Sequence, residues 1–175
     1  MSVKKWIALL LVAIFLTGCG AQETFETIQD EDIQSVMAMP RQVLIELPEE
    51  VTSPVMVGQT GEKLYFCDGY TLCLQTCSSG DLDATLQSVS GHTQDSLELQ
   101  TMKGNGEKRY FAVWTASSEE GEQIGRLCII DDGQFHYVAS VMADARVAGK
   151  LQQTWANLLD SFRVVDTVDD VNSGS

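Results

Sequence analysis

Apolar and polar residues alternate along most of the chain in a pattern that predicts β-strands joined by tight turns. Apolar or β-branched runs recur between short stretches rich in glycine, aspartate and serine from residue 41 onward. Runs with these boundaries are typical of strands. The pattern predicts strands at 41–47, 63–67, 70–77, 97–102, 108–116, 124–130 and 134–142, with shorter extended pieces at 54–58 and 163–165.

Asp68-Gly69 separates two of these runs and predicts a hairpin with a two-residue turn, since both turn positions need positive φ. This turn places Cys67 opposite Tyr70. The alternation of side chains then puts Cys67 and Cys73 on opposite faces, which argues against a disulfide between them. Both faces of the hairpin are fairly apolar, so we expect both to be covered.

Asp131-Asp132-Gly133 marks a second hairpin. A two-residue loop at Asp132-Gly133 would place Cys128 opposite Tyr137 and Ile129 opposite His136. The polar and acidic stretch 117–123 is predicted to be a loop between the strand at 108–116 and the first strand of this hairpin, at 124–130.

Two segments have the periodicity of amphipathic helices. The first is 81–90, where Asp81 and Asp83 favour the N-terminus and Gly91 is placed to end the helix in the left-handed conformation. The second begins at about Asp144 and ends at about Ser161. Its wide apolar stripe consists of Val147, Leu151, Trp155, Leu158, Leu159 and Phe162.

Hairpins imply antiparallel pairing, and amphipathic helices need a sheet to cover. The sequence therefore predicts an α+β domain, an antiparallel sheet of about six or seven strands covered by two helices.

The first 19 residues have the pattern of an export signal. Lys4 and Lys5 precede an apolar run of about a dozen residues, too short for a membrane-spanning helix, which needs about 20. Leu16-Thr17-Gly18-Cys19 then resembles the bacterial lipobox, in which the cysteine is acylated and becomes the new N-terminus. We therefore expect lipidation at Cys19 and location on the extracytoplasmic face of the cell membrane.

This signal gives the expected organisation of the chain. Residues 1–18 are a signal peptide, 19–40 an acidic tether, 41–165 a single α+β domain and 166–175 a disordered tail. Removing residues 1–18 leaves nine basic and 25 acidic residues, a formal charge of −16. Such a surface should repel nucleic acid and anionic headgroups, so no nucleic-acid partner is expected.

Four cysteines remain if Cys19 carries lipid: Cys67, Cys73, Cys77 and Cys128. Three full pairings are possible, and the sequence does not choose among them. Cys73 and Cys77 would lie about 13 Å apart on one strand, beyond disulfide reach. Their spacings do not match a structural zinc site, so no metal or other cofactor is expected.

The layout resembles the PsbP-like fold that is shared with the Mog family of Ran-binding proteins. The likeness spans residues 41–165, and the whole chain also resembles lipoproteins of Gram-positive gut bacteria. The residues that carry the fold resemblance are Tyr110-Phe111-Ala112-Val113-Trp114, Ile130-Asp131-Asp132-Gly133 with His136-Tyr137-Val138, and Trp155 with Ser161-Phe162. The resemblance implies partner binding or assembly rather than a shared catalytic site, and it assigns a role to no residue.

His136, with Asp131 and Asp132, is the candidate ligand pocket. A histidine beside carboxylates or a thiol is the kind of pair that catalyses hydrolysis, but no nucleophile motif accompanies it. Clustered acidic residues also raise the hypothesis of a divalent-cation site, without the spacing of an EF-hand.

From these observations we expect a membrane-anchored extracytoplasmic lipoprotein that acts as a non-catalytic binding or assembly domain. Its partner would be a protein or a small molecule. The alternatives are an envelope enzyme that uses His136 and an acidic divalent-cation binder.

Overall fold

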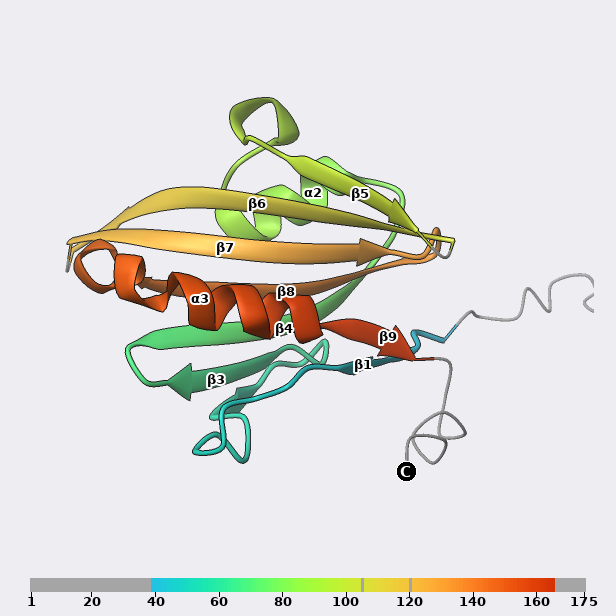
Figure 1. Cartoon of the computed structure of the whole chain (residues 1–175). Coiled ribbons are helices and arrows are strands. Elements are labelled where there is room, and N and C mark those ends of the chain that lie inside the picture. Colours follow the sequence, from blue (N-terminus) through green and yellow to red (C-terminus); the bar gives the residue numbers. More distant parts are fainter. Residues whose placement is uncertain (1–38, 105, 120, 166–175) are drawn as a thin grey trace, which may run out of the picture. The chain divides into compact units, whose positions relative to one another are not determined.

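The computed structural model describes residues 39–165, apart from positions 105 and 120. The predicted signal peptide, Cys19, nearly all of the tether and the tail at 166–175 lie outside the described residues. Figure 1 shows the described part as a curved sheet with one long helix along its front face.

Seven antiparallel strands form the main sheet in the order β2-β3-β4-β8-β7-β6-β5. A separate two-stranded sheet pairs β1 (Gln42–Leu44) with β9 (Arg163–Val165). The strands of the main sheet are β2 (Met56–Val57), β3 (Lys63–Cys67), β4 (Tyr70–Ser78), β5 (Gln100–Gly104), β6 (Glu107–Ser118), β7 (Gly121–Asp131) and β8 (Phe135–Asp144).

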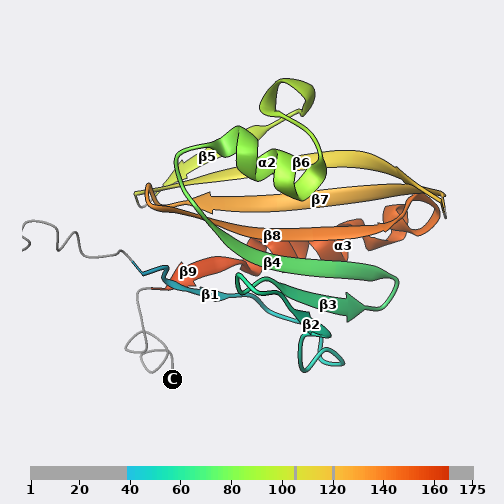
Figure 2. The same ribbon diagram turned by 180° about the vertical axis from the view of Figure 1, so that it is seen from behind.

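Two α-helices cover opposite faces of the sheet. Helix α3 (Ala145–Ser161) packs on β7 and β8 from the front in Figure 1, and α2 (Leu82–Ser90) lies on the other face in Figure 2. A single 3-10 turn, η1 (Gln94–Ser96), connects α2 to β5. The predicted α+β class is therefore confirmed.

The helix boundaries follow the predicted capping residues. The Asp81 carboxylate accepts a hydrogen bond from the Ala84 N–H at 2.9 Å, and Gly91 ends α2 at a φ of 76°. At the start of α3, the Asp144 carboxylate accepts from the Arg146 N–H at 2.8 Å. Both signals act within one turn of the chain, which is why the sequence is sufficient to place them.

Each face of the sheet has its own apolar core. On the α3 face, Trp155 is buried and its ring meets Tyr70 edge-on, with 6.1 Å between the ring centroids. On the α2 face, Leu86 packs on side chains from β6, β7 and β8, which are Ala112, Trp114, Leu127, Ile129 and Val138.

Among the described residues, Gly125 is the one strand position where the packing requires glycine. It pairs with Trp114 on the neighbouring strand, and the indole lies directly over it. A Cβ atom at position 125 would lie 2.2 Å from Cζ2 of Trp114, which no real contact allows. The buried tryptophan and the glycine are therefore a matched pair.

The Asp68-Gly69 hairpin has the predicted register, with Cys67 opposite Tyr70 and Tyr65 opposite Leu72. The expectation that both of its faces are covered is wrong. Phe66, on the α2 face, is 63% exposed. The reason is that α2 packs over β6, β7 and β8 and leaves β3 uncovered.

The register predicted for the second hairpin is also wrong. Asp131 pairs with His136, and Cys128 pairs with Ala139, so residues 132–135 form a four-residue loop. The cause is the side chain of Asp132, which bonds to the N–H groups of Gln134 and Phe135 and holds them in the turn. The shift is by two residues, so each side chain keeps its predicted face.

Two further details differ from the sequence prediction. The polar stretch 117–123 is not a loop, because pairing between β6 and β7 continues to Ser118 and Gly121. Val147, assigned to the apolar stripe of α3, is exposed, and Ala148 is buried beside it. Within the described part of the chain, Cys67, Cys73, Cys77 and Cys128 are all free thiols.

Candidate functional site

The turn between β7 and β8 is organised by Asp132. One carboxylate oxygen, Oδ1, accepts hydrogen bonds from the backbone N–H groups of Gln134 at 2.9 Å and Phe135 at 2.7 Å. Gly133 has a φ of 89°, and its N–H donates to the Asp131 carboxylate at 2.8 Å. Both aspartates that the sequence singled out therefore shape their own turn.

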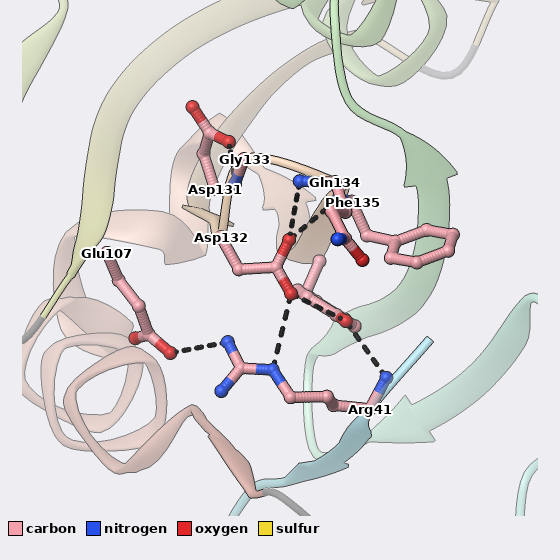
Figure 3. Close-up of polar contacts among 8 residues, drawn as sticks. Arg41, Glu107, Asp131, Asp132, Gly133, Gln134 and Phe135 are labelled. Atoms are coloured by element: carbon pink, nitrogen blue, oxygen red, sulfur yellow. Dashed lines mark hydrogen bonds and ion pairs between the residues drawn. The ribbon is translucent and has the colours of Figure 1, made fainter. Parts of the chain in front are cut away.

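The second oxygen of Asp132 joins the turn to the start of the domain (Figure 3). Arg41 donates from Nε to Asp132 Oδ2 at 3.2 Å and from Nη2 to Glu107 Oε1 at 2.8 Å. The Tyr137 hydroxyl donates to Asp132 Oδ2 at 3.1 Å and accepts from the Arg41 backbone N–H at 2.9 Å. We refer to Arg41, Glu107, Asp132 and Tyr137 as the Asp132 network.

These contacts stabilise the charged form of Asp132. Burial alone raises the pKa of this carboxyl, but the N–H groups of Phe135 and Gln134, the Tyr137 hydroxyl and Arg41 outweigh it and hold the pKa below the usual range. The Asp132 carboxylate is therefore held in its charged form by hydrogen bonds and an ion pair within the protein.

His136 lies in the core beneath α2 and is only 3% exposed. Its Nδ1 is 2.8 Å from the hydroxyl of Thr85 in α2, and its Nε2 is 4.0 Å from Asp131 Oδ1. Burial lowers the pKa of His136, although the nearby carboxylates of Asp131, Asp132 and Asp81 act in the opposite direction. This packed, neutral ring offers no open face to a substrate.

The thiols do not supply a nucleophile for His136. Cys128 is on the opposite face of the sheet, and burial raises its pKa to about 12, so it stays protonated at neutral pH. Cys77 is directly opposite His136 on β4, a pairing that sequence reasoning missed, but burial raises its pKa as well. The packing of His136 therefore removes the observation on which the enzyme alternative depended.

The carboxylates of the acidic turn are also engaged by contacts within the protein, which disfavours their use as metal ligands. The Asp132 oxygens are already bonded within the protein, and Asp131 is held by Gly133. Across residues 39–104, 106–119 and 121–165, no group of three or more histidine, cysteine or acidic side chains is arranged to hold a metal ion.

A cleft on the α3 face has the features that the predicted pocket lacks. Helix α3 runs over β7 and β8 and leaves the β6 and β5 side of the sheet open, which produces a hollow of about 330 Å³. Its apolar lining includes Phe111 and Val113 from β6 and Leu159 from α3. Val113 is 50% exposed there. We call this hollow the α3–β6 cleft.

Three charged side chains also line the α3–β6 cleft: Arg126 from β7, Asp160 from α3 and Glu98 from the segment before β5. Among the described residues, none of the three has a hydrogen-bond or ion-pair partner for its side chain. The cleft therefore combines an apolar floor with charges that are free to meet a ligand, as ligand sites commonly do.

Sequence reasoning missed this cleft because it depends on how far α3 extends across the sheet. One signal was present in the sequence. Arg126 is the only charged residue in the apolar strand segment 124–130, and a lone charge in such a strand often has a specific role.

No protein-family model matches the chain, and no curated protein matches it either. Among solved structures, the chain is similar to the 1.9 Å crystal structure of the Saccharomyces cerevisiae Ran-binding protein Mog1p. The TM-score is 0.44 at 13% identity, and the match covers 74% of this chain and 97% of Mog1p. This likeness concerns layout alone, and we take no function from it.

None of the helices in the described residues is long and apolar enough to cross a membrane.

Proposed function

We propose that this protein is a lipid-anchored extracytoplasmic domain that binds a small partner molecule and does not catalyse a reaction. The anchor is supported by the sequence, in which a basic start and a short apolar run lead to Leu16-Thr17-Gly18-Cys19. The binding role is supported by the structure around the α3–β6 cleft.

The observation that carries the binding role is the set of unpartnered charges in this cleft. Arg126, Asp160 and Glu98 line one hollow, and within the part of the chain that the structure describes none of them is hydrogen-bonded or ion-paired. A few charged groups beside an apolar floor are the features by which a ligand site orients its ligand. The packed state of His136 gives the enzyme alternative no comparable support.

Intact-mass measurement of protein extracted from membranes tests the anchor. The expected mass is that of a chain beginning at Cys19 with lipid attached, and Cys19→Ala should abolish both cleavage and lipid. Cys67→Ala is the matched control, because it removes a cysteine outside the signal and should leave processing unchanged. An unmodified thiol at position 19, or the leader still attached, would show that the proposal is wrong.

Backbone-amide NMR with a general fragment library tests the binding role. Compounds that bind should shift resonances of the residues lining the α3–β6 cleft more than those of the turn at 132–135. If no fragment of any charge perturbs the cleft at millimolar concentration, the cleft is not a binding site and this half of the proposal fails.

A further inference from the structure

The lining of the α3–β6 cleft also indicates what kind of molecule it would take, and this inference rests on the proposed binding function. Its floor is apolar and open, with Val113 half exposed and Phe111 partly buried beside Leu159. Burial of such side chains by an apolar group on the ligand is favourable, since it removes apolar surface from water. The ligand should therefore carry an apolar group.

The charges around this floor are of both signs and stay separate. Arg126 forms no ion pair with Asp160 or Glu98, although all three line the same hollow within the described chain. A guanidinium offers a planar fork of donors that suits a carboxylate, while carboxylates accept from an ammonium group. Complementary groups on one ligand would meet both signs.

A ligand with a single charge fits this lining less well. An anion that reaches Arg126 would also approach the carboxylates of Asp160 and Glu98. The formal charge of −14 over the whole chain adds to that repulsion. A cation would be attracted by the two carboxylates but would meet Arg126. A zwitterion avoids both conflicts.

We propose that the α3–β6 cleft binds a small zwitterion with an apolar side chain, in which Arg126 receives the carboxylate and Asp160 and Glu98 receive the ammonium group. Apolar α-amino acids and short peptides made of them share this chemistry. A volume of about 330 Å³ is at the low end of the range for small-molecule sites, about 300–1,000 Å³, and so favours one or two residues over a longer peptide.

Calorimetry with the mature chain in detergent tests this assignment. The probes are L-phenylalanine, 3-phenylpropionate, which lacks the ammonium group, and 2-phenylethylamine, which lacks the carboxylate. We expect phenylalanine to bind about tenfold or more tightly than either singly charged probe, since each of them forms only one of the two charge-assisted contacts. L-leucine and the dipeptide Leu-Leu distinguish a free amino acid from a peptide, and binding of either supports the proposed class.

Substitutions of the charged residues in the cleft test which group of the ligand each of them binds. Arg126→Gln should weaken phenylalanine binding about tenfold or more, and Arg126→Lys should restore part of the loss because it keeps the charge but not the fork. Asp160→Asn and Glu98→Gln together should bring phenylalanine down to the affinity of phenylpropionate. Arg163→Gln is the matched control, since it changes an exposed arginine on β9 that does not line the cleft.

Three results would overturn the assignment without deciding the proposed function, which has its own experiments. Equal binding of phenylalanine and one singly charged probe would show a site for that single charge. Unchanged phenylalanine affinity in Arg126→Gln would place the ligand elsewhere. Absence of binding by all three probes and by both leucine compounds at millimolar concentration also rejects the zwitterion, while the lipid anchor and fragment binding are judged by their own experiments.

Discussion

The Asp132 network and the α3–β6 cleft each bring an arginine near two acidic side chains, but only in the first do the charges meet. Arg41 is bonded to both Asp132 and Glu107, and the Asp132 carboxylate is only 12% exposed. In the cleft, the charged side chains have no partners within the described residues. The two regions therefore differ in whether their charges are used within the protein, and this difference is the basis for placing the proposed binding site in the cleft.

The candidate pocket that the sequence analysis named lies at the first of these regions. Asp131, Asp132 and His136 stand close together in the chain and form a cluster that chemistry could use. In the structure their polar atoms are used internally, to hold the turn and to attach β8 to α2. Substitutions that treat the two regions in parallel will show whether this contrast is correct.

The largest effect on stability is expected from Trp155→Ala, which weakens the packing of α3, the helix that forms one wall of the α3–β6 cleft. Trp155 is 1% exposed and anchors α3 to the sheet. Truncation of a buried aromatic side chain should lower the free energy of unfolding by about 3–5 kcal/mol. Urea denaturation measures this loss, and a much smaller loss would mean that α3 does not depend on this contact.

The next effect separates the two regions directly. Asp132→Ala leaves the N–H groups of Gln134 and Phe135, the Tyr137 hydroxyl and Arg41 without their acceptor. We expect a loss of about 2–3 kcal/mol, since partly buried donors lose both their bond and their contact with water.

Asp160→Ala is the control for Asp132→Ala, because it makes the same substitution at a carboxylate in the cleft. It should change stability by no more than about 0.5 kcal/mol. Equal losses in the two variants, measured by the same denaturation, would remove the distinction between a structural network and a binding cleft.

A pH dependence is expected from His136. Because burial holds its pKa below the ordinary value of 6.5, the unfolded chain binds more protons than the folded one as the pH falls through that value. Stability that is present above pH 6.5 is therefore lost toward pH 5, with a slope of at most about 1.4 kcal/mol per pH unit. Asp132 acts in the same direction only at lower pH, below its ordinary value of 3.8.

His136→Gln should flatten this slope, since the amide can still bond to Thr85 but does not titrate. Denaturation midpoints between pH 7.5 and 5 would measure it, with His92→Gln, at the chain's other histidine, as the matched control. A slope that is unchanged in His136→Gln would mean that this ring is not the group responsible.

The smallest effect on stability is expected from Arg126→Ala. The Arg126 side chain has no hydrogen bond or ion pair in the described structure, so unfolding free energy should change by no more than about 0.5 kcal/mol. Arg41→Ala, the parallel change in the Asp132 network, should cost more because it frees Asp132 and Glu107. Thermal unfolding of the two variants measures both losses of stability. A loss in Arg126→Ala as large as that in Arg41→Ala would contradict the contrast between the two regions.

The features that the sequence predicted correctly depend on neighbours in the chain. The turn at Asp68-Gly69 and the caps at Asp81 and Asp144 are decided within a few residues, so their residues are sufficient to place them. The α+β class follows from the same information, because hairpins and two amphipathic helices leave few ways to bury their apolar faces.

The features that it missed depend on pairing between distant segments. The opposition of Cys77 and His136 arises from β4 beside β8, and nothing in either segment specifies that neighbour. The extent of α3 across the sheet, which creates the α3–β6 cleft, has no local signal either. Even the turn at 132–135 was misread, because a side chain bonding to its own loop outweighed the two-residue hairpin rule.

The position of Arg41 has a mechanical consequence. This residue comes immediately before β1, and its guanidinium bridges Asp132 in the β7–β8 turn and Glu107 at the start of β6. A force applied from the N-terminal side would load these contacts of Arg41 before the three residue pairs that join β1 to β9. The first strand could therefore be pulled away from β9 only after the ion pairs of Arg41 with Asp132 and Glu107 had broken.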